Sequence, residues 1–408
     1  MTSEVTATRL RDEIRSLAAL PTTTERRQDT VDQSELMDIT LPGTSFSIQT
    51  LASQVVKVFG VERQSDISGE FTIENNRLRL HLRLGGKPFF VSAQGADPNR
   101  PEDLMNEAAR AVLGVTQPYI LALIQLEIDK NYNSALATAE SMISGTSHAD
   151  VPVSWVFTIK GMALADLGRM DEAATEYEKA IASDPKDPYP HYDRGGALLT
   201  LGRMDEALTE YDKAVNLDPK FADAHNGRGT VLRHLGRAEV AMTEYNEAVA
   251  LDPKSAYAYC GRSYILRDLG HPDEAMIGFE KAIALDPKFA EPVSGRGYVL
   301  RDLKHPDEAM SEFEKAIALD PKFADPHNGR GATLRDLGRT DEAIAEFKMA
   351  IALDPMFADP HYNMGLLLND LGRGDEAKAE FDEAHTLALT HVGIVAYLRN
   401  VERQVDGR

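Results

Sequence analysis

The sequence predicts a mainly α protein, an α-solenoid of helix hairpins preceded by a small α+β module. An Asp-Pro pair returns every 34 residues along the C-terminal part of the chain, with two apolar-periodic segments between successive pairs. The N-terminal part contains a single alternating stretch, RLRLHLRL at 77–84, which favours a strand. The pairs are Asp184-Pro185, Asp218-Pro219, Asp252-Pro253, Asp286-Pro287, Asp320-Pro321 and Asp354-Pro355.

The composition indicates a folded chain without signs of export. Its 408 residues are 43% hydrophobic, and Cys260 is the only cysteine, which fits a reducing compartment. Residues 1–30 lack the apolar run of a signal peptide, and the most apolar segment, 119–128, is too short to cross a bilayer. The net charge of −21 argues against nucleic acid as a general partner. We therefore expect a cytoplasmic protein with no membrane insertion.

The first two regions of the chain differ from the rest. Residues 1–40 are polar and rich in threonine and charge, so we expect a flexible segment. Residues 41–115 are expected to form the small α+β module. Its predicted helices are 46–60 and 100–114, and its predicted strands are 69–73, 77–84 and 87–93.

Residues 116–150 are expected to form a degenerate helix pair of the same kind as the later units. Ala135, Ala139 and Met142 stand there where the regular units have alanine, an aromatic residue and alanine. Residues 151–391 hold seven regular units. Residues 392–408 are then predicted to form a C-terminal capping helix, because the last unit of a solenoid needs a cover for its apolar face.

Each unit reads as two helices separated by a turn. Glycine ends the first helix, since a left-handed residue is inexpensive only for glycine. An Asp-Glu pair then places negative charge at the positive end of the second helix, and the proline of the Asp-Pro pair stops it. The turn glycines are Gly202, Gly236, Gly270, Gly338 and Gly372.

A second glycine recurs inside the first helix, and we expect it to face an alanine of the second helix. This contact would let the two backbones approach closely and would offset the cost of glycine in a helix, roughly 1 kcal/mol. An aromatic residue follows each alanine by four residues. In the third unit the three residues are Gly229, Ala241 and Tyr245.

A 34-residue helix–turn–helix unit with glycine, alanine, an aromatic residue, alanine and proline in this order resembles a tetratricopeptide repeat (TPR) of bacterial type. The resemblance implies a right-handed superhelix that holds partners in its concave groove. The departures are small, with Lys304 in place of a turn glycine and Ser263 in place of a helix glycine. The seven units begin at Ser154, Pro188, Ala222, Ala256, Ala290, Ala324 and Ala358.

Other motifs have simpler explanations than chemistry. The basic residues of 77–84 fit the wet face of an antiparallel sheet better than an anion site. A recurring histidine is expected to pack rather than bind metal, because its copies lie one unit apart. Cys260 has no local signature of a nucleophile, and no Ser-His-Asp set or carboxylate pair stands out in the sequence. We therefore predict a protein that is not an enzyme and needs no cofactor or metal. The recurring histidines are His191, His225, His327 and His361.

The candidate partner-binding residues lie at positions 2, 5, 9 and 12 of the units, one stripe of the first helix. Arginine, tyrosine and asparagine suit an extended peptide and its carboxylates. The alternative is that the arginines pair with acids at position 2, such as Asp223, Glu291, Asp325 and Asp359. The proposed groove residues are Arg233, Arg267, Arg301, Arg335, Tyr257, Tyr264, Tyr298, Asn226 and Asn328.

The sequence therefore predicts a protein-interaction scaffold or adaptor that binds a partner protein or peptide, in which acidic groups could meet the arginines. A regulatory sensor is the alternative, in which the N-terminal module binds a ligand and signals through the array. Fold alone does not decide between them, because the specificity of a repeat array lies in its surface side chains. The oligomeric state is left open.

Overall fold

The computed structural model describes residues 67–74, 77–84, 87–91, 118–127, 129–144 and 151–390. These residues fall into two compact units that meet in sequence between Ala163 and Leu164. The predicted flexible segment 1–40, the predicted helices 46–60 and 100–114 and the predicted capping helix lie outside the described residues. The domain boundaries stay predictions.

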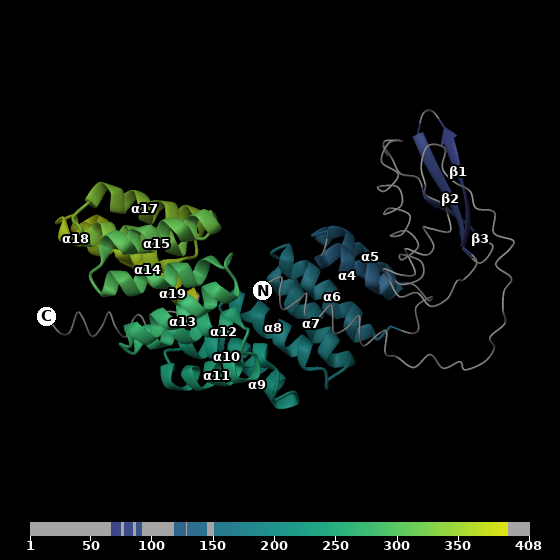
Figure 1. The fold of residues 1–408 in the computed structure, drawn as a ribbon, viewed down its shortest axis with the longest axis horizontal. Coiled ribbons are helices and arrows are strands. Elements are labelled where there is room, and N and C mark those ends of the chain that lie inside the picture. Colours follow the sequence, from purple (N-terminus) through teal and green to yellow (C-terminus); the bar gives the residue numbers. More distant parts are fainter. Residues whose placement is uncertain are drawn as a thin grey trace. The chain divides into compact units, whose positions relative to one another are not determined.

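A small antiparallel sheet lies in the first unit (Figure 1). The strands are β1 (Ile67–Glu74), β2 (Arg77–Leu84) and β3 (Lys87–Val91), in the order β1-β2-β3. Ile67 pairs with Leu84 and Glu74 with Arg77, while Leu84 also pairs with Lys87 on the other side. The alternating segment 77–84 is therefore the central strand.

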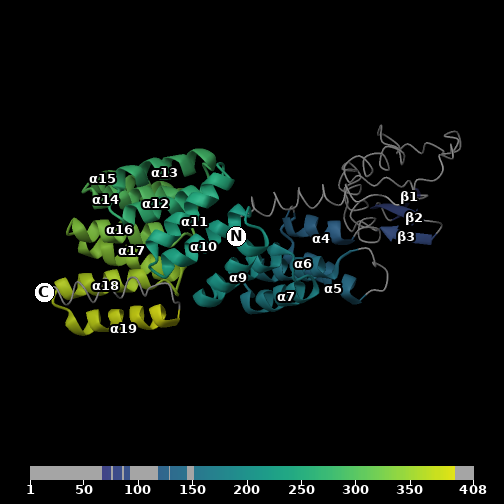
Figure 2. The ribbon, with the colours of Figure 1, turned by 90° about the horizontal axis from the view of Figure 1, so that it is seen from below.

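Sixteen helices and no further strand make up the rest of the described chain. The helices α8 to α19 follow one another as stacked antiparallel pairs, coloured from teal to yellow in Figures 1 and 2. The bounds are α4 (Pro118–Glu127), α5 (Tyr132–Ser144), α6 (Val153–Asp166), α7 (Met170–Ser183), α8 (Pro188–Thr200), α9 (Met204–Leu217), α10 (Ala222–His234), α11 (Ala238–Leu251), α12 (Ala256–Asp268), α13 (Pro272–Leu285), α14 (Ala290–Asp302), α15 (Pro306–Leu319), α16 (Asp325–Asp336), α17 (Thr340–Leu353), α18 (Ala358–Asp370) and α19 (Gly374–Thr390).

The pair α4–α5 buries the three residues that the sequence analysis placed at the repeat positions. Ala135, Ala139 and Met142 are all buried. Ala139 and Met142 share a core cluster with Tyr119 of α4 and with Ile159 of α6. The pair therefore buries its apolar face as a regular unit does.

The conformations of the helix ends explain why glycine and the Asp-Pro pair recur once in each repeat. Each turn glycine has a positive φ, for example 73° at Gly202, and Lys304 adopts the same conformation at 66°. The aspartate of each Asp-Pro pair ends a second helix and its Oδ1 accepts the backbone N–H two residues later, an Asx turn. The N–O distance is 2.9 Å from Lys220 to Asp218 and 3.0 Å from Met356 to Asp354.

The glycine inside the first helix faces an aromatic ring, so the expected glycine–alanine contact is wrong. A Cβ at Gly229 would lie 3.1 Å from the Tyr245 ring of the same pair, and a Cβ at Gly261 would lie 2.3 Å from it on the other side. The ring is thus held between glycines of two successive pairs, where a larger side chain would overlap it. Tyr211 lies in the same way between Gly195 and Gly227, and Phe313 between Gly297 and Gly329.

The helix pairs of the second unit are arranged in two layers. Each first helix packs against the next first helix, from α8 through α10, α12, α14 and α16 to α18. Each second helix packs against the first helix of the following pair, as α11 does against α12. No helix in the described ranges is both long and apolar enough to span a bilayer.

Candidate protein-interaction face

The candidate site is the stripe of first-helix residues at positions 2, 5, 9, 12 and 13 of the units, called here the first-helix face. Residues three or four apart on a helix share one side, so these positions line up along each first helix. Because first helices are neighbours in the array, the side chains of one repeat reach those of the next. The described part of the face runs along α10, α12, α14, α16 and α18.

Two of the four candidate arginines form ion pairs across a repeat boundary. Arg267 Nε lies 2.7 Å from Asp302 Oδ2, and Arg301 Nε lies 2.8 Å from Asp336 Oδ2. Arg335 lies 3.3 Å from the same Asp336. The paired acids stand at position 13 of the units, not at position 2 as the alternative supposed.

Arg233 differs from the other three arginines. It has no ion pair within the described residues, and its buried Nε makes no hydrogen bond there. Its guanidinium lies 5.0 Å from the centre of the Tyr264 ring, as that of Arg267 does from the Tyr298 ring. Burial opposes the charged form, but Tyr245 and Glu291 outweigh it and raise the pKa of Arg233. The cation is therefore held in place without a direct counter-ion.

The two position-9 tyrosines are structural parts of the face. Tyr264 and Tyr298 are buried and lie edge-on against Phe279 and Phe313, at 5.1 Å between ring centres. The Tyr298 hydroxyl donates to Asp325 Oδ1 at 2.9 Å. The hydroxyl is thus used inside the protein, and these rings serve mainly as platforms for the arginines.

The two asparagines have different surroundings. Asn328 is 3% exposed, donates to the Tyr298 hydroxyl at 3.3 Å and accepts from Asn363 at 2.9 Å. Asn226 Oδ1 is buried and makes no hydrogen bond within the described residues. The ring of the remaining candidate, Tyr257, lies against that of Phe289, with 4.5 Å between the ring centres and a tilt of 49°. Asn226 is therefore the amide with unused capacity.

The acids at position 2 form a column of partly buried carboxyl groups. Burial, assisted by Asp252, raises the pKa of Asp223 to about 6. Burial, assisted by Asp325, raises the pKa of Asp359 to about 6 as well. Burial also raises the pKa of Glu291 and of Asp325. Neither Asp223 nor Asp359 has an ion-pair partner in the part of the chain that the structure describes.

The recurring histidines lie away from this face and belong to ion-pair networks between the two helices of a pair. Nδ1 of His191 lies 2.6 Å from Glu210, and Nδ1 of His225 lies 2.8 Å from Glu244. Within the described ranges, no group of three histidine, cysteine or acidic residues could hold a metal ion. Sequence reasoning missed the glutamates, although their place 19 residues after each histidine repeats with the period. His327 pairs with Glu346, and His361 with Glu380.

Models of one repeat family match most of the helix pairs. Tetratricopeptide repeat models match residues 160–220, 192–256, 256–289, 295–323 and 312–345, and a TPR repeat model matches 331–372. The chain belongs to the tetratricopeptide repeat family. The resemblance to tetratricopeptide repeats is thereby confirmed, while the bounds of the seven units, bacterial origin and a cytoplasmic location stay predictions.

Solved TPR structures share the fold of this TPR chain. A tetratricopeptide repeat protein from Parabacteroides merdae is 18% identical with a TM-score of 0.52, over 62% of this chain and 99% of that one. The APC/C hetero-tetramer Cut9–Hcn1 has the same identity and TM-score, over 72% of this chain and 59% of that one. At this identity the likeness shows the fold alone. No curated protein matches the chain.

Proposed function

We propose that this TPR protein is a non-enzymatic scaffold that holds a segment of a partner protein on its first-helix face. TPR arrays are built for such contacts, since stacked repeats give a long surface whose side chains vary while the fold does not. The nine candidate residues stand on four successive first helices, α10, α12, α14 and α16, an arrangement that would suit a single extended ligand. The proposal includes the cytoplasmic location expected from the sequence.

The observation that carries the proposal is the difference between Arg233 and the other arginines of its column. Arg267 and Arg301 already have Asp302 and Asp336 within 2.8 Å. Arg233 has no such acid, so its charge is available to a ligand. A carboxylate that replaces water there gains a charge-assisted hydrogen bond in a half-buried place.

The neighbouring groups on α10 extend this site. Asn226 and Arg233 stand at positions 5 and 12 of the same helix, about two turns apart. The open Oδ1 of Asn226 suits a backbone N–H of an extended peptide, while Arg233 suits a carboxylate. We therefore propose that the segment crosses α10 and α12, with its acidic group at Arg233. Arg267, Arg301 and Arg335 hold the repeats together beside it.

An array of short peptides of varied sequence, probed with the full chain, tests the proposal. Peptides that bind the wild type should bind Arg233→Gln at least tenfold more weakly, which corresponds to about 1.4 kcal/mol. The matched control is Arg301→Gln, the same change at the same repeat position. It breaks a partly exposed ion pair worth about 0–1 kcal/mol and should leave peptide binding within twofold.

The outcome against the proposal is also clear. If both variants bind the same peptides as tightly as the wild type does, the first-helix face is not the binding surface. If Arg301→Gln loses binding and Arg233→Gln retains it, the open cation is not the anchor. Raised salt should weaken the wild-type complex, because the contact at Arg233 is electrostatic.

A further inference from the structure

Another arginine column, at position 7 of the units, joins each repeat to the one before it. Arg228 lies 2.7 Å from Asp212 of the preceding repeat and 3.1 Å from Glu244 of its own. Arg194 bridges Glu178 and Glu210, and Arg330 bridges Glu314 and Glu346 in the same way. In these three repeats one arginine lies between two carboxylates, while Arg296 of the same column pairs within the described residues with Glu312 at 3.8 Å.

Arg262 lacks a carboxylate on both sides. Gly278 stands where the own-repeat glutamate would be, and Asn246 stands where the preceding repeat would supply an acid. Arg262 has no ion pair among the described residues. Its guanidinium lies 5.1 Å from the centre of the Tyr259 ring, which occupies the place of the recurring histidine. A half-buried cation has thus lost both of its usual counter-ions.

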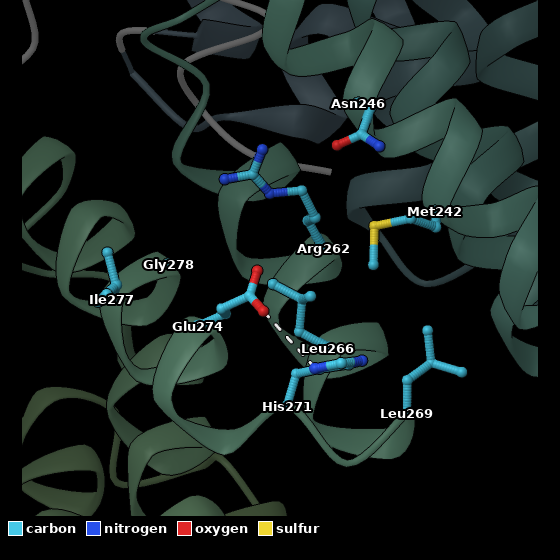
Figure 3. Close-up of a pocket in the computed structure, with 9 residues that line it drawn as sticks. All are labelled: Met242, Asn246, Arg262, Leu266, Leu269, His271, Glu274, Ile277 and Gly278. Carbon is cyan, nitrogen blue, oxygen red and sulfur yellow. Dashed lines mark ion pairs between the residues drawn. The ribbon is translucent and has the colours of Figure 1, made fainter.

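These replacements leave a pocket of about 540 Å³ between α11, α12 and α13, called here the α11–α13 pocket. Figure 3 shows Arg262 and Asn246 on one side of it and Glu274, paired with His271 at 3.5 Å, on another. Its volume lies in the range of ordinary ligand sites. The apolar residues that line it are Met242, Leu266, Leu269 and Ile277.

Apolar exposure at the edge of the pocket is greatest at Ile277, which is 67% exposed and stands where neighbouring repeats have Thr243 and Ser311. Leu269 beside it is 46% exposed, as its counterparts in the following repeats also are. Exposed apolar side chains grouped beside a polar anchor are typical of binding sites. The pocket therefore offers a single unpaired cation next to a wall of aliphatic side chains.

Packing alone explains only one of the replacements. A Cβ at Gly278 would overlap Ser263 Oγ, which donates to the Tyr259 carbonyl, so a larger residue there would displace the hydroxyl of the serine that replaces the helix glycine. This contact says nothing about Asn246, because that side chain is exposed on α11 and an acid would fit there. The corresponding residues of the other second helices include Glu178, Asp212, Glu280 and Glu314.

We propose that the α11–α13 pocket binds the C-terminal residue of a partner protein whose last side chain is aliphatic. Such a residue brings a carboxylate and an apolar group from adjacent atoms, which is the pairing that Arg262 and the aliphatic wall require. The guanidinium accommodates a carboxylate with paired hydrogen bonds, and the Asn246 amide can bond the last peptide group. This site lies on other residues than the first-helix face and does not depend on it.

The test uses fluorescein-labelled hexapeptides that end in leucine, with varied preceding residues, measured by fluorescence polarisation on the full chain. Each peptide is made as the free acid and as the C-terminal amide. The proposal expects saturable binding of free acids and at least tenfold weaker binding of the matching amides. Octanoate, a carboxylate without a peptide, serves as a competitor and should compete poorly.

Two variants and a control locate the site. Asn246→Asp restores the acid of the preceding repeat, so it should pair with Arg262 and weaken binding of the free acids at least tenfold. Arg262→Gln should do the same by removing the cation. Asn216→Asp makes the same chemical change at an exposed residue of α9 and should leave binding unchanged. All three should fold as the wild type, because no described ion pair is lost.

Four results would overturn the proposal. Equal binding of acid and amide would remove the role of the carboxylate, and unchanged binding by Asn246→Asp would place the peptide elsewhere. Octanoate binding without peptide binding would make the pocket a small-molecule site. No saturable binding by any free acid would leave the pocket without its proposed ligand. The effect of Arg233→Gln on peptide binding at the first-helix face does not change the interpretation of these four results.

Discussion

The pairs α8–α9 and α12–α13 have helices of the same lengths, 13 and 14 residues, yet differ at one place between the helices. In α8–α9 the Glu210 side chain is 4% exposed and contacts His191, Arg194 and Lys213. In α12–α13 the equivalent residue is Gly278, and a pocket lies beside it. The first pair has an ion-pair network at this position, and the second has a pocket.

The difference shows that the equivalent positions of the other repeats serve as a standard against which one repeat can be compared. Because the backbone is the same at each position, a residue that departs from its column changes the chemistry and little else. In a domain without repeats, an arginine beside a glycine would not indicate a missing partner. Here the equivalent positions of the other repeats show which two carboxylates Arg262 lacks.

The largest expected effect that sharpens this comparison comes from Glu210→Gln. The change leaves His191 and Arg194 without their buried partner, and removing one member of a buried network costs about 3 kcal/mol. Amide hydrogen exchange in α8 and α9 should report the loss locally, since each repeat depends on its neighbours. The counterpart Arg262→Gln should cost at most about 1 kcal/mol, the value of its contact with Tyr259. Equal losses would mean that the two places are not different.

A smaller effect is expected from Gly278→Glu, which attempts to restore the missing acid. The new Cβ would overlap Ser263 Oγ, and such overpacking typically costs about 1–3 kcal/mol. Adding Ser263→Gly should recover most of that loss, because it rebuilds the arrangement of the other repeats and supplies Arg262 with a partner. Urea unfolding of the single and double variants measures the coupling. An additive double variant would contradict the steric account.

The smallest expected effect is on the pH dependence of stability, which should fall on both sides of a maximum. The pKa of Asp223 and of Asp359 is raised to about 6, so their contribution favours the folded state at low pH and is lost as pH rises through about 6. The hydrogen bonds from His191 and Lys213 outweigh burial and lower the pKa of Glu210 to about 2. Its contribution is full above its ordinary pKa of 4.5 and is lost as pH falls toward 2.

Urea midpoints measured across this range should therefore be highest near about pH 4, close to the ordinary pKa of 3.8 of the two aspartates. Asp223→Asn with Asp359→Asn should flatten the limb above that value, and Glu210→Gln should flatten the limb below it. A midpoint that rises steadily from pH 5 to neutral pH in the wild type would contradict the raised pKa of the two aspartates.

The fold of the array could be predicted from the sequence because its signals are local. The turn glycines, the Asp-Glu starts and the Asp-Pro ends each act on their own helix, and the structure has helix ends at those residues. The contact of Gly229 could not be predicted in the same way. Its neighbour is decided by the rotation between packed helices, which brought Tyr245 rather than Ala241 against it.

The positions of the candidate residues could be predicted from the sequence, but the ion-pair partners of the arginines could not. The column of arginines was visible, but the partner of Arg267 is Asp302, a residue of the next repeat that no spacing within one unit reveals. The sequence does show that Gly278 and Asn246 replace the acidic residues found at the same positions of other repeats. They were missed because no column of glutamates had been recognised before the structure connected Glu210 with His191 and Arg194.

The aromatic ring held between glycines of two successive pairs has a consequence for how such a chain can change its length. Tyr245 meets Gly261 of the next pair, and Phe279 meets Gly295 of the pair after that. Excision of residues 256–289 would bring Tyr245 opposite Gly295, and the boundary would be rebuilt from the same kinds of residue. Gene duplication or deletion could then add or remove a whole unit as a cassette. The cassette α12–α13 would take the cationic pocket with it and leave the rest of the array intact.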